Sequence, residues 1–107
     1  MAEYRYLTRT ISVGATASYT DIFIPEKPLK FKRLMVSERA GAALNNVHMQ
    51  ILIAGVPFIR ETIPLSVVGS TYDRALPLEF ETGGEIRIKI TNNTSTAITL
   101  DLVFEVE

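Results

Sequence analysis

Hydrophobic and polar side chains alternate at every second residue over most of this 107-residue chain. In segment 85–91 three isoleucines alternate with charged or polar residues. In segment 98–106 five hydrophobic residues alternate with Thr99, Asp101, Val103 and Glu105. A period of two is the signature of a β-strand with one face in a core and the other in water. The chain is therefore expected to fold as layers of β-sheet.

The same period divides the whole chain into about eight short strands, which end at proline, glycine or asparagine clusters. We predict strands at 5–13, 19–24, 29–38, 47–54, 58–63, 75–81, 85–91 and 98–106. Segment 66–73 is predicted as a loop or short strand, and segment 39–46 as a loop with at most one helical turn. The fold class that follows is all-β: a single domain, 1–107, forming an antiparallel eight-stranded β-sandwich of the jelly-roll or Greek-key type. The pattern does not distinguish this from an immunoglobulin-like strand order.

Two local features predict how strands bend and connect. Leu29 and Phe31 have one parity whereas Leu34 and Val36 have the other, which predicts a β-bulge near residues 32–33. The polar cluster 91–96 lies between the last two strands, so we predict that they form a hairpin. Asn92 and Asn93 begin Asn-x-Ser/Thr sequences, and we interpret both as turn residues.

Charge and composition exclude several function classes. The 11 basic and 12 acidic side chains give a net charge of −1, without the basic excess typical of nucleic-acid binding. A small basic cluster is interpreted as a solvated strand face: Lys27, Lys30, Lys32 and Arg33. The chain has no apolar run that could span a membrane and no signal-peptide pattern at its start, so we expect neither membrane association nor secretion through a signal peptide.

Residues that carry chemistry are sparse. There is no cysteine and a single histidine, His48, which argues against a thiolate site, a zinc site or a catalytic triad. Carboxylates are scattered, and no calcium-loop or phosphate-loop motif is present. We therefore expect no enzyme activity, no cofactor and no metal.

The more informative signal is hydrophobic residues at positions that should face water. These predict a contact surface for self-association: Leu52, Val67, Val68, Tyr72 and Val103. Tyr4 and Tyr6 share a parity and form a candidate platform for stacking a sugar, with subunit packing as the alternative. A carbohydrate-binding, lectin-like module is thus our second hypothesis.

The alternating strands and the segment 83–93, Gly-Gly-Glu-Ile-Arg-Ile-Lys-Ile-Thr-Asn-Asn, resemble small single-jelly-roll structural proteins of viruses and phages. The resemblance covers the chain as a pattern and includes no diagnostic motif. It implies a non-enzymatic capsid or decoration subunit that is located in the virion. Such a subunit would act as a homo-oligomer or pack against other capsid proteins.

Overall fold

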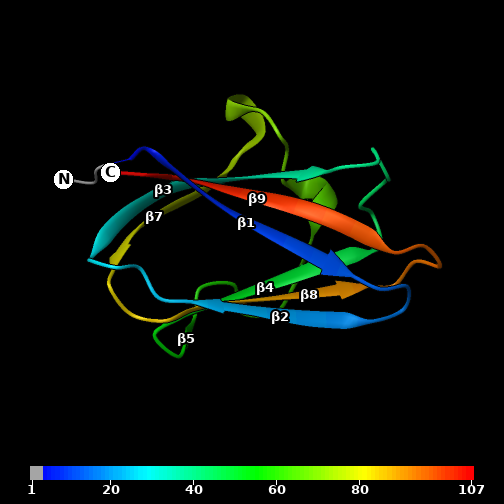
Figure 1. Ribbon diagram of the computed structural model, residues 1–107, viewed down its shortest axis with the longest axis horizontal. Coiled ribbons are helices and arrows are strands. Elements are labelled where there is room, and N and C mark those ends of the chain that lie inside the picture. The colour runs from blue at the N-terminus through cyan, green and yellow to red at the C-terminus, as the bar shows by residue number, and fades with distance from the viewer. Residues whose placement is uncertain (1–3) are drawn as a thin grey trace.

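The computed structural model describes residues 4–107 and shows an all-β architecture of two antiparallel sheets (Figure 1). Seven strands contain six to ten residues each: β1 Tyr6–Val13, β2 Ser18–Phe23, β3 Leu29–Glu38, β4 Val47–Ile53, β7 Leu76–Thr82, β8 Ile86–Asn92 and β9 Ile98–Val106. Two strands have two residues, β5 Val56–Pro57 and β6 Ile63–Pro64. Two short 3-10 helices follow them, η1 Leu65–Val67 and η2 Tyr72–Arg74.

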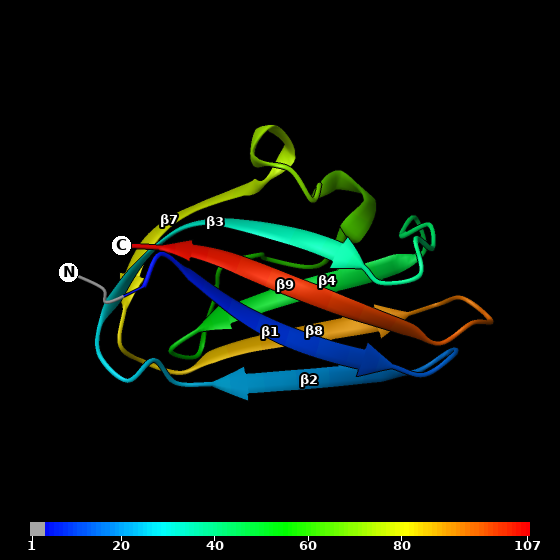
Figure 2. The same cartoon turned by 45° about the horizontal axis from the view of Figure 1, so that its top comes forward.

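The strand order is that of a jelly roll. Sheet A has the order β1-β9-β3-β7, and sheet B has the order β2-β8-β4-β5, with β6 also paired to β4. Successive long strands lie in opposite sheets, so the chain crosses the core at nearly every connection (Figure 2). Since β5 and β6 pair with the same strand, they act as one broken edge strand, and the predicted eight-stranded sandwich is confirmed. The immunoglobulin-like order that the sequence left open is excluded.

The core lies between the sheets and follows the alternation of the sequence. Every second residue of β8 and β9 is buried, and isoleucines of sheet B face leucines and Phe104 of sheet A. Phe31 connects three strands of sheet A within the core, because its ring lies 5.6 Å from the Phe104 ring on β9 and 5.1 Å from the Phe80 ring on β7. Burial of these side chains supplies the main driving force for folding.

Strand β3 contains the predicted bulge. Its register with both neighbouring strands shifts between Phe31 and Arg33, so that Phe31 and Leu34 both face the core. The extra residue turns Arg33 onto the outer face of sheet A, directly opposite Glu105.

The predicted hairpin between the last two strands is wrong. Strand β8 pairs with β2 and β4 in sheet B, whereas β9 pairs with β1 and β3 in sheet A. The turn therefore links the two sheets across the core. Alternation alone gives each strand a buried face, and it cannot say whether two such faces lie side by side or opposite each other.

The predicted strand at 58–63 is also wrong. Only the flanking pairs Val56–Pro57 and Ile63–Pro64 form strand pairing with β4. Residues 58–61 form bends, in which the Phe58 and Ile59 N–H groups donate to the Ile51 carbonyl. Proline has no backbone N–H to donate to a sheet, so Pro57 and Pro64 restrict pairing here. Segment 66–73 forms helical turns and a loop, while 39–46 is a loop as expected.

Candidate functional site

The outer face of sheet A brings together side chains from distant parts of the sequence. Tyr6 on β1 lies opposite Glu105 on β9, and Glu105 lies opposite Arg33 on β3. The next row of the sheet pairs Thr8, Val103 and Met35. These six residues form a continuous surface near the end of the sandwich that carries the C-terminus.

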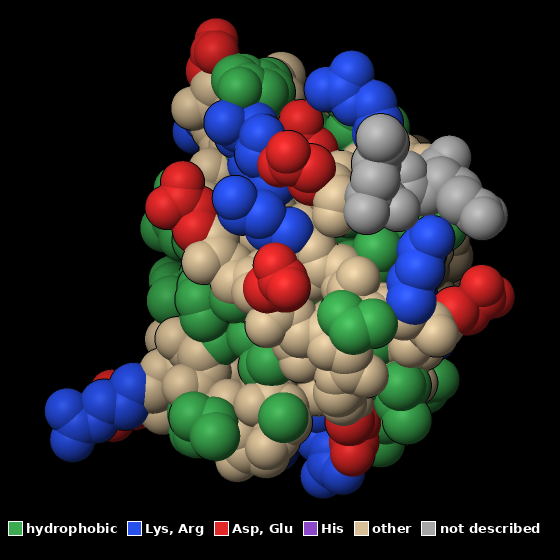
Figure 3. All heavy atoms as spheres, turned by 90° about the vertical axis from the view of Figure 1, so that its left-hand side faces the viewer, with side chains coloured by type: hydrophobic (Ala, Val, Ile, Leu, Met, Phe, Trp, Pro, Cys, Tyr) green, Lys and Arg blue, Asp and Glu red, His purple; other side chains and the backbone are tan. Residues whose placement is uncertain are grey.

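A buried carboxylate organises this surface. Glu105 is only 5% exposed although it points away from the core. Its carboxylate forms an ion pair with Arg33, and the Arg5 guanidinium lies 4.0 Å away. A buried charge is tolerated when it is paired and hydrogen-bonded, so Glu105 and Arg33 fix each other's positions. Basic and acidic side chains lie next to each other on this end of the molecule (Figure 3).

Tyr72 extends the surface outward. Its ring lies 3.9 Å from the Arg33 guanidinium carbon, the geometry of a cation–π stack. The Tyr72 side chain is nevertheless 61% exposed. One guanidinium thus binds a buried carboxylate and also supports an exposed aromatic ring.

Tyr72 belongs to a compact loop, 69–74, that projects above the edge of sheet A (Figure 2). The Gly69 N–H donates to the Arg74 carbonyl at 2.7 Å, and the Val36 N–H donates to the Gly69 carbonyl at 3.2 Å. A Cβ added to Gly69 would lie 2.3 Å from the Arg74 Cβ, so this closure requires glycine. Leu65 and Val68 are buried in the core and anchor the segment. The loop is therefore held in one shape.

Further along the same face, Asp101 joins two strands and a turn. It accepts a hydrogen bond from Thr10 and two from the Arg39 guanidinium, each of the latter at 3.0 Å. The bonds from Arg39 and Thr10 hold the pKa of the Asp101 carboxyl below its ordinary value.

Glu38 closes the adjoining turn. Backbone N–H groups of Ala42 and Thr99 bind its carboxylate and lower its pKa.

The structure brings two of the five predicted contact residues, Val103 and Tyr72, to one surface, together with Tyr6 of the predicted tyrosine platform, and separates the other three. Tyr6, Val103 and Tyr72 all contribute to the face described above. Leu52 lies on β4 of sheet B, and Val67 is exposed on η1. Val68 is only 4% exposed and packs in the core, so its predicted role in a contact surface is wrong.

The predicted tyrosine platform does not form. Tyr6 is 54% exposed on the outer face of sheet A, whereas Tyr4 lies beyond a bend at residue 5. Tyr4 lines a separate cleft at the edge of the sandwich. The bend breaks the alternation on which their shared parity depended.

Sequence reasoning missed Arg33 and Glu105 as site residues. Arg33 was grouped with the neighbouring lysines, of which Lys27 and Lys30 are exposed and Lys32 lies 3.6 Å from Glu107. The predicted bulge was the available signal, because it sets Arg33 apart from that cluster. Its partner on β9, Glu105, could be identified only once the register of sheet A was known.

Other chemistry is sparse in the described chain. Residues 4–107 contain no group of three side chains that could hold a metal ion. Within the same residues no helix is long and hydrophobic enough to cross a membrane. His48 lies on β4 with Asn93 3.5 Å from its ring, and no serine or cysteine in hydrogen-bond contact with it is found among these residues.

Comparison with known proteins identifies a fold. No protein-family model matches the chain, and no curated protein matches its sequence. Two solved structures match all of this chain and 92% of their own. PliG of Salmonella Typhimurium, a periplasmic inhibitor of g-type lysozyme, has 13% identity and a TM-score of 0.51. A mutant of PliG-Ec, a periplasmic inhibitor of g-type lysozyme from Escherichia coli, has 10% identity and a TM-score of 0.52.

These matches overturn our expectations about function. The matched proteins are inhibitors rather than capsid or decoration subunits. The predicted resemblance to virion proteins and the predicted structural role in a virion are therefore wrong. The predicted virion location and the predicted homo-oligomeric or capsid partners are wrong for the same reason. They do not support the lectin-like alternative either. One sandwich architecture serves many functions, so a jelly-roll pattern was a poor guide to role. The chain is similar in fold to periplasmic lysozyme inhibitors.

Proposed function

We propose that this chain is a non-enzymatic protein inhibitor that binds a g-type lysozyme through loop 69–74 and the adjoining outer face of sheet A. The observation that carries the proposal is Tyr72, an exposed aromatic ring held on a closed loop by Arg33 and Glu105. The fold similarity to two g-type lysozyme inhibitors supports the choice of partner. A periplasmic location, as in those inhibitors, is part of the same proposal.

The surface has the composition of a protein-binding site. Tyrosine and arginine dominate the residues that contribute most energy to protein interfaces. Here Tyr6, Arg33 and Tyr72 lie together, with Met35 and Val103 as hydrophobic neighbours. Because the core of an interface tolerates few unpaired charges, the internal pairing of Arg33 with Glu105 favours burial against a partner.

Rigidity of the loop favours inhibition in particular. An inhibitor that enters an enzyme cleft binds more tightly when its loop already has the bound shape, since less conformational entropy is lost. The closure between Gly69 and Arg74, together with the buried anchors Leu65 and Val68, supplies that shape. A projecting loop is also the part of a convex surface that reaches into a concave cleft.

The test is a lysis assay. A purified g-type lysozyme is mixed with increasing amounts of this protein, and the fall in turbidity of a bacterial cell-wall suspension is recorded. We expect lysis to slow in proportion to the protein added, with a lysozyme of another type as the specificity control. An unchanged rate at a large molar excess, with no binding in calorimetry, would overturn the proposal.

A matched pair of variants tests the surface. Tyr72→Ala should raise the concentration needed for half-inhibition about 30-fold, the effect of losing about 2 kcal/mol at a hot spot. Tyr19→Ala removes another exposed tyrosine, on β2 of sheet B, and should leave inhibition unchanged. Equal effects from the two variants would contradict the assignment of this face.

A further inference from the structure

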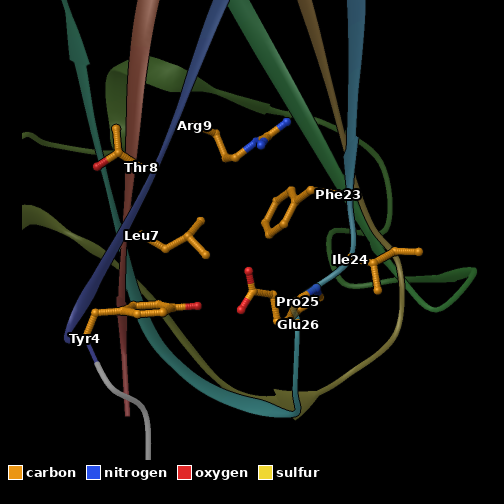
Figure 4. A pocket seen from close by; sticks show the side chains of 8 residues that line it. All are labelled: Tyr4, Leu7, Thr8, Arg9, Phe23, Ile24, Pro25 and Glu26. Carbon is orange, nitrogen blue, oxygen red and sulfur yellow. The ribbon is translucent and has the colours of Figure 1, made fainter.

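A cleft opens at the edge of the sandwich where β1 of sheet A and β2 of sheet B meet (Figure 4). Its volume is about 200 Å³, and eight residues line it: Tyr4, Leu7, Thr8, Arg9, Phe23, Ile24, Pro25 and Glu26. The strands β1 and β2 are the edges of different sheets, so no backbone ladder closes the gap between them. Loop 69–74 lies beside β3 and β7, at the opposite edge of sheet A.

The inner end of the cleft is electrically neutral. The Arg9 guanidinium donates two hydrogen bonds to the Asp21 carboxylate, both at 2.8 Å. It also lies 5.0 Å from the centre of the Phe23 ring. The charge of Arg9 is therefore matched within the protein, and its side chain forms a fixed wall.

The outer end carries an unmatched negative charge. The Glu26 side chain points toward the Tyr4 ring across the space in Figure 4. Among residues 4–107, no lysine or arginine forms an ion pair with Glu26. Arg9, its partner Asp21 outside the lining and Glu26 together carry a net charge of −1, which favours a cation at the Glu26 end.

We infer that this edge cleft binds a lysine side chain presented by a protein partner. A lysine side chain combines an aliphatic stem with a compact ammonium group. Leu7 and Pro25 offer apolar contact to the stem, and Glu26 offers an ion pair to the ammonium group. Tyr4 and Phe23 add aromatic surface to the lining, and the Phe23 ring already lies beside the Arg9 guanidinium.

Size selects a single side chain over a larger ligand. Pockets for drug-sized molecules measure about 300–1,000 Å³, larger than this cleft. An anionic ligand is disfavoured, because Arg9 already binds Asp21 and the remaining charge is the Glu26 carboxylate. The cleft is separate from loop 69–74 and shares only Thr8 with the outer face of sheet A, and the inference rests on Glu26 and so does not depend on the proposed function.

The experiment is a titration followed by backbone amide shifts in NMR. The probe is the capped tripeptide acetyl-Gly-Lys-Gly-amide at constant ionic strength. We expect saturable shifts at residues 7–9 and 23–26, and none from the same tripeptide with an acetylated lysine. A capped Gly-Glu-Gly tripeptide serves as the anionic control. Equal shifts from the acetylated or the anionic peptide would overturn the inference.

Paired variants separate the cleft from general surface charge. Glu26→Gln preserves the size of the side chain, removes its charge and should weaken binding of the lysine peptide at least tenfold. Glu81→Gln, at an exposed site on β7 across the sheet, should leave the affinity unchanged. An unchanged affinity in Glu26→Gln, with its spectrum showing an intact fold, would also overturn the inference. Lysozyme inhibition, measured separately, does not enter either comparison.

Discussion

The turn between β8 and β9 should depend on one buried side chain, Asn92. This residue is fully buried at the point where the chain crosses from sheet B to sheet A. Its amide nitrogen donates to the carbonyls of Gly14 at 3.1 Å and Thr96 at 2.9 Å. Its amide oxygen accepts from the Thr94 N–H at 3.0 Å and from the Thr94 hydroxyl at 2.7 Å. One side chain therefore ties together two connections between the sheets at this end, β1–β2 and β8–β9.

The cost of Asn92→Ala follows from these four bonds. A hydrogen bond contributes about 1 kcal/mol net, and a buried group left without a partner costs more. In the variant the Thr94 hydroxyl no longer donates to Asn92 and its hydrogen can go to the Thr96 carbonyl, and residues 95–97 of the turn are exposed to water, which reduces the loss. We expect destabilisation by about 3–4 kcal/mol, a large share of the roughly 5–15 kcal/mol that stabilises a typical domain. The melting temperature should fall by about 12–16 °C.

The measurement is urea unfolding and thermal unfolding, followed by circular dichroism. Asn93→Ala is the matched control, because the Asn93 side chain makes only a 3.5 Å contact with His48, and its effect should stay within about 0.5 kcal/mol. Asn92→Asp keeps the shape but turns both donors into acceptors that face carbonyl oxygens, so it should destabilise at least as strongly at neutral pH. A loss below about 1 kcal/mol for Asn92→Ala would refute the argument that this network holds the turn.

Three further outcomes test other parts of the structure. Glu38 has a lowered pKa in the folded state, so its contribution to stability is present above the pKa of an unfolded glutamate, about 4.3, and is lost as the pH falls through the lowered value. The stability difference between wild type and Glu38→Gln should therefore shrink between pH 7 and pH 2 in urea unfolding. Arg33→Lys keeps a positive charge near Glu105 but removes the planar stack on Tyr72, and should weaken lysozyme inhibition about tenfold with little change in circular dichroism. Gly69→Ala places a Cβ against Arg74 and should weaken inhibition by distorting the loop, which amide shifts confined to 69–74 would verify.

The strands were predictable because burial on one face imposes a period of two. The predicted and observed bounds agree within two residues for seven strands, and the bulge in β3 followed from a change of parity. Pairing was not predictable in the same way. The hydrophobic faces of β8 and β9 fit a hairpin and a pair of facing sheets equally well, and only the packing of the whole core decides between them. Pro57 and Pro64, which have no N–H to donate, were the signal that strand pairing is interrupted here. The hydrophobic residues between them nevertheless led to the prediction of one continuous strand.

The candidate site illustrates a deeper limit of pattern reasoning. Tyr72 and Val103 were found because they are hydrophobic where water was expected, a rule that operates on one residue at a time. The same rule could not detect Glu105 and Arg33, because charged residues are expected at strand positions that face water. Their importance arises from pairing across 72 positions of sequence, after a bulge has turned Arg33 toward β9. A buried ion pair on an outer sheet face costs desolvation energy and is a weak source of stability. Its position beneath an exposed tyrosine is better explained by binding than by folding, and for that reason the Arg33–Tyr72 stack, rather than the hydrophobic residues alone, defines the surface we propose for the lysozyme.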